Sequence, residues 1–393
     1  MKRTRKRRDI WWFSSTMVVV ALLLSTTLLA ACGPTAEPTS APEPTAAEAV
    51  EPTEAAEPAG EEIPDNLKGS GEVVIGLWGG AMQDAQREAI FKSFEELTGI
   101  TVREVPAMGT AELKAAIDSG SLEMDVMQTD SLMVLNLNSQ GEYFLPVDYS
   151  YVDVDNIDAS HRQEYWLGFL PYAGVIGYRT DVFSEEDHPS SWAEFWDTEK
   201  YPGPRTLPSA EGGMWPPLEY ALMADGVPLD QIYPIDIDRA FNAMSRIRPD
   251  VVKWWDASAI PAQLLSDGEV VAGAIWNGRA AAAAEGGAPI AIEWNQAMLL
   301  EDVWAIPASS QNLENAQKFI GYASRAAPQA RLSSLITYGF TNNKAAELLP
   351  EERLKMLPTN PELQGKTLLF NSQWWADNIN EVVEKWSEWI LEE

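Results

Sequence analysis

Residues 72–105 read EVVIGLWGGAMQDAQREAIFKSFEELTGITVREV, and this stretch decides the fold class. The apolar run at 72–78 ends in two glycines and is typical of a buried strand. From Met82 to Leu97 the apolar residues recur at helical spacing, and Gly99 stands where a helix C-cap glycine belongs. Residues 100–105 form a second apolar strand pattern. A strand, a helix and a strand in succession predict an α/β fold with a mostly parallel sheet.

The same alternation continues through the rest of the chain. Further helices are expected at 110–119, 131–139, 191–195, 218–224, 237–247, 261–266, 315–324 and 375–390, and further strands at 125–128, 174–178, 270–276, 290–294 and 303–307. Ligands of doubly wound sheets bind beyond the carboxyl ends of the strands. Trp78 and Asp130 stand at two such ends and are candidate ligand contacts. The alternative for Asp130 is a helix N-cap.

The N-terminus has the pattern of an export signal. Residues 1–9 contain six basic residues, and residues 11–31 are uncharged and almost wholly apolar or small. This pattern predicts a secretory signal, with a permanent membrane span as the alternative. The end of the run, Leu29-Ala30-Ala31-Cys32, resembles the bacterial lipobox. We therefore expect a signal peptide at 1–31, a lipid on Cys32, and a protein held at the extracytoplasmic face of a membrane, at the cell surface or in the periplasm.

A stretch rich in Pro, Ala, Glu and Thr follows at 32–66. Its composition cannot bury enough apolar surface to offset the entropy of ordering, which predicts a disordered tether. Because Cys32 is the only cysteine of the chain, the fold contains no internal disulfide.

Composition excludes several function classes. The chain has 28 basic and 59 acidic residues and a net charge of −31, which argues against a nucleic-acid partner. Two histidines leave little for a transition-metal site, and no metal or cofactor is predicted. Of the sixteen tryptophans, two lie in the predicted signal. The remaining fourteen exceed what core packing requires, and aromatic-lined ligand sites are one use for them.

Five motifs occur in an order and spacing that resemble a known family. They are FKSFEELTGITV (91–102), SSWAEFWD (190–197), DGEVVAGAIWNG (267–278), VWAIPASSQNLENAQKFI (303–320) and TYGFTNN (337–343). Together they resemble the type 2 periplasmic solute-binding proteins of ABC importers, in the polyamine (spermidine and putrescine) branch. The resemblance implies a two-lobed clamshell, with lobe one at 67–178 and 303–393 and lobe two at 179–302. It implies a monomer that delivers a small solute to the membrane-spanning permease subunits.

The resemblance also implies site residues. Polyamine binders hold ammonium groups between aromatic faces and carboxylates. Trp78 and Trp276 match the two tryptophans of the family, Asp302 matches an acid that contacts an amine, and Tyr338 matches a tyrosine of a late loop.

Some positions depart from the family pattern. The acidic pair at the start of lobe two has only Glu211 nearby, and an aromatic position of the family is Leu300 here. Arg279 directly follows the Trp-Asn-Gly motif; it would suit an ω-amino acid such as 4-aminobutyrate, or would pair with Asp302. Trp255 either lines the cleft or packs as a wedge.

The expected function is therefore a receptor for a small amine, with an ω-amino acid or a sugar as alternatives. A distant alternative is an extracellular glycoside-acting enzyme, which would need two carboxylates at a defined separation.

Overall fold

The computed structural model describes residues 61–211 and 214–392. The described part lies in one compact unit, 52–393. The predicted signal peptide, the lipid site at Cys32 and residues 32–60 of the tether lie outside the described residues.

One sheet runs through the described part of the chain in the strand order β2-β1-β3-β9-β5-β8-β6-β7, and the short strands β4 and β10 also pair with β9. Its strands are β1 (Glu72–Leu77), β2 (Thr101–Pro106), β3 (Val126–Asp130), β4 (Phe144–Leu145), β5 (Trp166–Arg179), β6 (Arg205–Pro208), β7 (Val251–Trp255), β8 (Ala272–Trp276), β9 (Ile290–Pro307) and β10 (Leu368–Leu369). Strands β2, β1 and β3 are parallel, and so are β8, β6 and β7. Each three-stranded group is the sheet of one lobe, which confirms the predicted α/β class.

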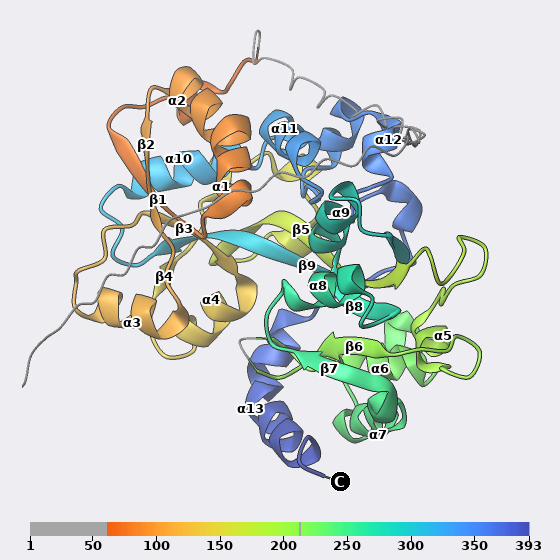
Figure 1. The fold of residues 1–393 in the computed structure, drawn as a ribbon. Coiled ribbons are helices and arrows are strands. Elements are labelled where there is room, and N and C mark those ends of the chain that lie inside the picture. The colour runs from red at the N-terminus through yellow and green to blue at the C-terminus, as the bar shows by residue number, and fades with distance from the viewer. Residues whose placement is uncertain (1–60, 212–213, 393) are drawn as a thin grey trace, which may run out of the picture. The chain divides into compact units, whose positions relative to one another are not determined.

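Two long antiparallel strands, β5 and β9, join the lobes. In Figure 1 they run from the group around β1 and β3 to the group around β6 and β8. The sequence predicted strands only at 174–178, 290–294 and 303–307. The structure extends the first one back to Trp166 and merges the other two into β9. Asn295 and Gln296 interrupted the apolar pattern, and the strand continues past them through a bulge in which Gln296 has a left-handed φ of 62°.

Helices flank the sheet in both lobes. Those beside the first group of strands are α1 (Gly80–Gln86), α2 (Lys92–Thr98), α3 (Thr110–Asp118), α4 (Ser131–Asn138), α10 (Leu313–Ala323), α11 (Ala326–Leu335) and α12 (Glu351–Leu354). The others are α5 (Trp192–Trp196), α6 (Leu218–Ala224), α7 (Ile237–Ile247), α8 (Ile260–Asp267), α9 (Asn277–Glu285) and α13 (Ser372–Trp389). Gly99 ends α2 in the left-handed conformation at φ 79°, as its position predicted.

The core of lobe one packs the helix α2 against the helix α10. The rings of Phe94 and Phe319 meet edge to face at 5.4 Å, and the fully buried Trp304 of β9 packs on Phe319 at 5.1 Å. Segments before 178 and after 303 thus share one apolar core.

The last helix packs with the other lobe. Trp375, Val382, Trp386 and Trp389 of α13 are buried in the same cluster as Phe241 of α7. In Figure 1 α13 lies beside the strands β6 and β7. The large side chains of α13 thus pack with lobe two, while the helix also contacts α4 of lobe one. The assignment of all of 303–393 to lobe one stays a prediction, because the apolar stripe of α13 does not reveal which lobe it covers.

The start of the fold is also earlier than predicted. Glu61 is half-buried beside Arg331, with 3.0 Å between its Oε2 and the Arg331 Nη1, and a short 3-10 turn follows at Asp65–Leu67. Residues 61–66 were predicted to belong to the tether but pack on lobe one, because a charge partner far along the chain holds Glu61.

Candidate functional site

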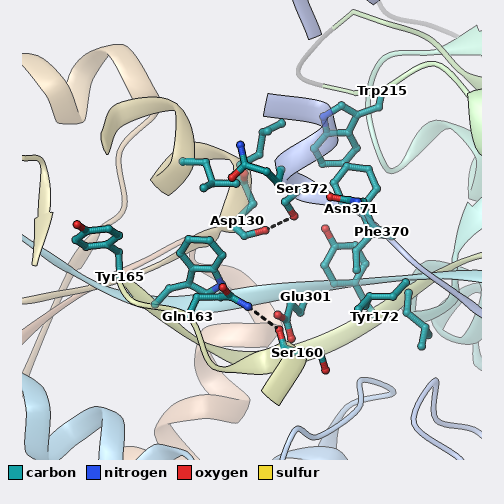
Figure 2. Close-up of a pocket in the computed structure, with 18 of the residues that line it drawn as sticks. Asp130, Ser160, Gln163, Tyr165, Tyr172, Trp215, Glu301, Phe370, Asn371 and Ser372 are labelled. Atoms are coloured by element: carbon teal, nitrogen blue, oxygen red, sulfur yellow. Dashed lines mark hydrogen bonds between the residues drawn. The ribbon is translucent and has the colours of Figure 1, made fainter. Parts of the chain in front are cut away.

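A cavity of about 540 Å³ lies where the two lobes and the joining strands meet. Lobe one contributes the start of α4, β5 and β9 contribute Tyr172 and Glu301, and lobe two contributes Trp215 and Tyr233. Figure 2 shows Tyr172, Phe370 and Trp215 along one side and Tyr165 on the opposite side. A concave site with a few polar groups among aromatic walls is typical of small-molecule binding.

Asp130 is at once a helix cap and a wall of this cavity. It ends β3 and caps α4, where its Oδ1 accepts a hydrogen bond from the Met133 N–H at 2.8 Å. Burial raises the pKa of its carboxyl, while the backbone donors at the helix start act in the opposite direction. The two readings of Asp130 from sequence are therefore compatible.

Asp302 is the cross-strand partner of Asp130, in the antiparallel pair of β3 and β9. The Gln128 Nε2–H donates to Asp302 Oδ2 at 2.6 Å. Burial raises the pKa of Asp302 to about 7. The charge of Asp130 also raises this pKa, whereas the hydrogen bond from Gln128 lowers it. The two carboxyls therefore form one coupled acidic pair.

Arg279 does not neutralise this pair. Its side chain is exposed on α9, and among the described residues no ion pair joins it to Asp302. Its charge does act on Tyr338, whose pKa is raised by burial and by Asp302 and lowered by Arg279. Arg279 thus lies on the edge of the same cluster, and the predicted structural pairing with Asp302 is absent from the part of the chain that is described.

Tyr172, which sequence reasoning missed, is the centre of the aromatic groups. Its ring meets the Trp276 ring edge to face at 5.4 Å and the Tyr338 ring at 6.4 Å. Burial, and then the charges of Asp302 and Asp130, raise its pKa well above the ordinary value. The predicted strand began two residues later, and an earlier start would have placed Tyr172 on a joining strand.

Trp276 and Trp255 pack behind the main cavity. The Trp255 ring is fully buried, meets Trp276 edge to face at 5.7 Å, and donates its Nε1–H to the Ala274 carbonyl at 3.1 Å. Both rings line a second cavity of only about 10 Å³. In this structure Trp255 has the contacts of a packing wedge, and Trp276 supports Tyr172.

Trp78 and Glu211 lie apart from the cluster. Trp78 follows β1 and is 53% exposed, and Glu211 is exposed beside the undescribed residues 212–213. Neither lines the two cavities described above.

Sequence reasoning also missed an ion pair at the cavity. His161 Nδ1 lies 2.6 Å from Glu301 Oε2, and Glu301 lines the cavity beside Ser160. Burial by itself lowers the pKa of His161, but the hydrogen bond and charge of Glu301 outweigh it, so the pKa is raised. Glu301 directly precedes the predicted Asp302 in the sequence. This adjacency is the one sequence signal that could have indicated Glu301.

The described residues contain neither a metal-binding cluster nor a membrane-spanning helix. No group of three or more His, Cys, Asp or Glu side chains is arranged to hold a metal ion within 61–211 and 214–392. Over the same ranges, every helix is too short or too polar to cross a bilayer.

The chain matches known proteins over most of its length. Residues 89–363 match the family described as "Bacterial extracellular solute-binding protein", and the chain belongs to this family. It is a type 2 periplasmic binding protein of the kind that serves ABC importers, with two lobes.

Three relatives illustrate the match. The gamma-aminobutyric acid-binding protein of Pseudomonas aeruginosa is 31% identical over 79% of this chain and 89% of its own. The spermidine/putrescine-binding periplasmic protein 1 of Haemophilus influenzae is 26% identical over 78% of this chain and 85% of its own. The crystal structure of an ABC transporter substrate-binding protein from Bradyrhizobium japonicum USDA 110 superposes with a TM-score of 0.74 at 34% identity, covering 82% of this chain and 99% of its own. These relatives are described as binding proteins and not as enzymes.

Proposed function

We propose that this chain is the lipid-anchored receptor of an ABC importer and that it binds a small amine-containing solute between its lobes. The observation that carries the proposal is the acidic pair of Asp130 and Asp302 beside the partly buried ring of Tyr172, which lines the cavity. An ammonium group gains from a carboxylate and an aromatic face in a site shielded from water. The relatives that bind gamma-aminobutyric acid, spermidine or putrescine support an amine.

The solute belongs either to the polyamines or to the ω-amino acids, and Arg279 distinguishes them. Its charge acts on Tyr338, which in turn lies near Asp302. A cation and a carboxyl at one site suit a zwitterion, whereas a polyamine would be repelled by Arg279. The greater identity to the gamma-aminobutyric acid binder supports the ω-amino acid reading.

A titration series by calorimetry and thermal shift tests the proposal. The wild-type protein is titrated with 4-aminobutyrate, putrescine, spermidine, choline and maltose. Stabilisation by an amine that follows its concentration over its Kd supports the proposal. If only maltose stabilises the protein, the amine reading is wrong.

Two variants locate the solute. Asp302→Asn keeps the shape and a hydrogen-bond acceptor but removes the charge, and we expect amine affinity to fall about tenfold or more. Arg279→Ala is expected to weaken 4-aminobutyrate binding and to leave putrescine binding unchanged or stronger. Arg239→Ala, which removes an exposed cation paired with Asp225, is the control.

The lipid anchor at Cys32 is part of the proposal and supports delivery of the solute to a permease. A monomer on a tether at the extracytoplasmic face would stay close to the permease subunits. Cell fractionation tests this anchor: wild-type protein should sediment with membranes, and a Cys32→Ser variant should not. Equal sedimentation of both would contradict a lipid on this cysteine.

A further inference from the structure

Glu219 is a buried carboxyl that the solute site described above does not use. It lies on α6, is 1% exposed, and has no ion-pair partner among the described residues. Its Oε1 accepts hydrogen bonds from the Tyr233 hydroxyl at 2.6 Å and from the Trp375 Nε1–H at 2.7 Å. A buried carboxyl without a cation carries a desolvation cost, so these two donors indicate a role for the group.

The hydrogen bonds of Glu219 lead to the wall of the 540 Å³ cavity. The Tyr233 hydroxyl also accepts a hydrogen bond from the Asn371 backbone N–H at 3.1 Å. Both Tyr233 and Asn371 line the cavity. The chain of contacts therefore runs from Asn371 through Tyr233 to the buried carboxyl, and from there to Trp375 of α13.

The segment 368–372, which holds Asn371, contacts both lobes. Its strand β10 pairs with β9, and the Phe370 ring lies 5.2 Å from that of Trp215 and stacks on that of Trp375 at 5.9 Å. On the lobe-one side, the Ser372 hydroxyl lies 2.6 Å from that of Ser131, next to Asp130 (Figure 2). Besides the joining strands β5 and β9, this segment of the cavity wall therefore also connects the two lobes.

We propose that Glu219 is a positioning residue: acting through Tyr233 and Trp375, it holds the segment 368–372 in place as a wall of the solute cavity. The consequence for solute affinity rests on the proposed function, but the positioning itself does not. Removing the acceptor leaves the buried Trp375 N–H and the half-buried Tyr233 hydroxyl without this partner, and the segment then loses the fixed Tyr233 hydroxyl on which the Asn371 N–H depends.

Four variants test this inference. Glu219→Gln keeps an oxygen that can accept both hydrogen bonds, whereas Glu219→Leu removes it. Tyr233→Phe removes the hydroxyl between Glu219 and Asn371 and is available if the leucine variant does not fold. The matched control is Tyr322→Phe, which removes a buried hydroxyl bonded to Ser93 at 2.8 Å in the core of lobe one.

The first measurement is hydrogen–deuterium exchange without any solute. We expect the amides of 368–374 to exchange about tenfold faster in Glu219→Leu and Tyr233→Phe than in the wild type, and at the wild-type rate in Glu219→Gln and Tyr322→Phe. Unchanged protection in Tyr233→Phe overturns the inference, whatever the solute proves to be. If the amides of 368–374 also exchange faster in Tyr322→Phe, the cause is general destabilisation, and the inference is again overturned.

The second measurement is the Kd for 4-aminobutyrate and for putrescine, at a temperature where all variants are folded. A loss of about tenfold in affinity in Tyr233→Phe and in Glu219→Leu, together with near wild-type affinity in Glu219→Gln, supports the role in solute binding. If the wild type binds neither amine, the proposed function fails, while the exchange result still decides the inference.

Discussion

Asp130 and Asp302 are direct partners in the antiparallel pairing of β3 and β9, so two carboxyls meet at the junction of the lobes without an ion-pair partner in the described part of the chain. Like charges on paired positions of a sheet destabilise it. Burial raises the pKa of both carboxyls, so a proton is retained near neutral pH, and this proton relieves the repulsion between them. An ammonium group would take the place of that proton.

The first prediction follows for Asp302 and pH. Because its pKa rises from 3.8 to about 7 on folding, the native state binds the proton more tightly than the unfolded chain. The contribution of Asp302 to the free energy of unfolding is therefore greatest below about pH 4. It falls by on the order of 2–4 kcal/mol as pH rises to about 7. Urea unfolding of the wild type and Asp302→Asn across pH 4 to 8 measures this: the decline should be smaller in the variant by this amount, because the other groups of raised pKa remain.

Amine affinity should have the opposite dependence. Only the ionised carboxylate attracts the ammonium, so the affinity of the wild type should rise from pH 5 to 8 and level off above it. A flat calorimetric profile for the wild type would contradict the titration of Asp302 in this range.

The second prediction concerns His161 and Glu301. Since folding raises the pKa of His161, the ion pair contributes in full below pH 6.5 and is lost as pH rises through the higher folded pKa. Glu301→Gln should therefore cost about 1–2 kcal/mol at pH 6 and less at pH 9. Denaturant unfolding at the two pH values measures the difference between the wild type and the variant. An equal cost at both pH values would contradict the pairing.

The third prediction separates binding from stability at Trp78. A ring that is 53% exposed contributes little to folding, so Trp78→Ala should change the free energy of unfolding by less than about 0.5 kcal/mol. If Trp78 covers the solute when the lobes close, the same variant weakens amine binding about tenfold. Calorimetric titration of the Trp78→Ala variant, once its melting temperature is shown to be unchanged, measures this effect. If the variant binds the amine with the affinity of the wild type, Trp78 is not part of the site.

The fourth prediction concerns the lobe to which α13 belongs. Trp386 is buried between Trp254 and Trp389, with ring separations of 5.3 and 5.2 Å. Trp386→Ala should cost about 3–5 kcal/mol and increase exchange in α7, because a buried tryptophan is lost from that core. Val383→Ala, on the exposed face of the same helix, should cost less than about 0.5 kcal/mol. Faster exchange in α2 instead of α7 would assign the helix to lobe one.

Local patterns predicted most of the elements. The expected helices at 218–224 and 237–247 match α6 and α7 residue for residue. The helix expected at 191–195 is α5, where Ser191 caps the helix by accepting the Glu194 N–H at 3.2 Å and the Glu194 side chain accepts from the Ser190 N–H. These features depend on neighbours within four residues, which the sequence displays directly.

The remaining features depend on contacts far along the chain. Periodicity indicates that α13 has an apolar face but not which lobe that face covers. In the same way, the pairing of Asp130 with Asp302 depends on the register of β3 and β9, and the burial of Glu219 depends on Trp375, which lies 156 residues later. The candidate site residues themselves remain proposals, of which the structure gathers Asp130, Trp276, Asp302 and Tyr338 around Tyr172.

The packing of α13 also has a consequence for the timing of folding. Lobe one needs the strand and helix at 303–323 for its core, and lobe two needs the tryptophans at 375–389. Lobe two therefore cannot complete its core before residues 375–389 have been made, although domains usually fold in order from the N-terminus. A nascent chain holds the strands and helices of 179–302 without the tryptophans that cover them until then.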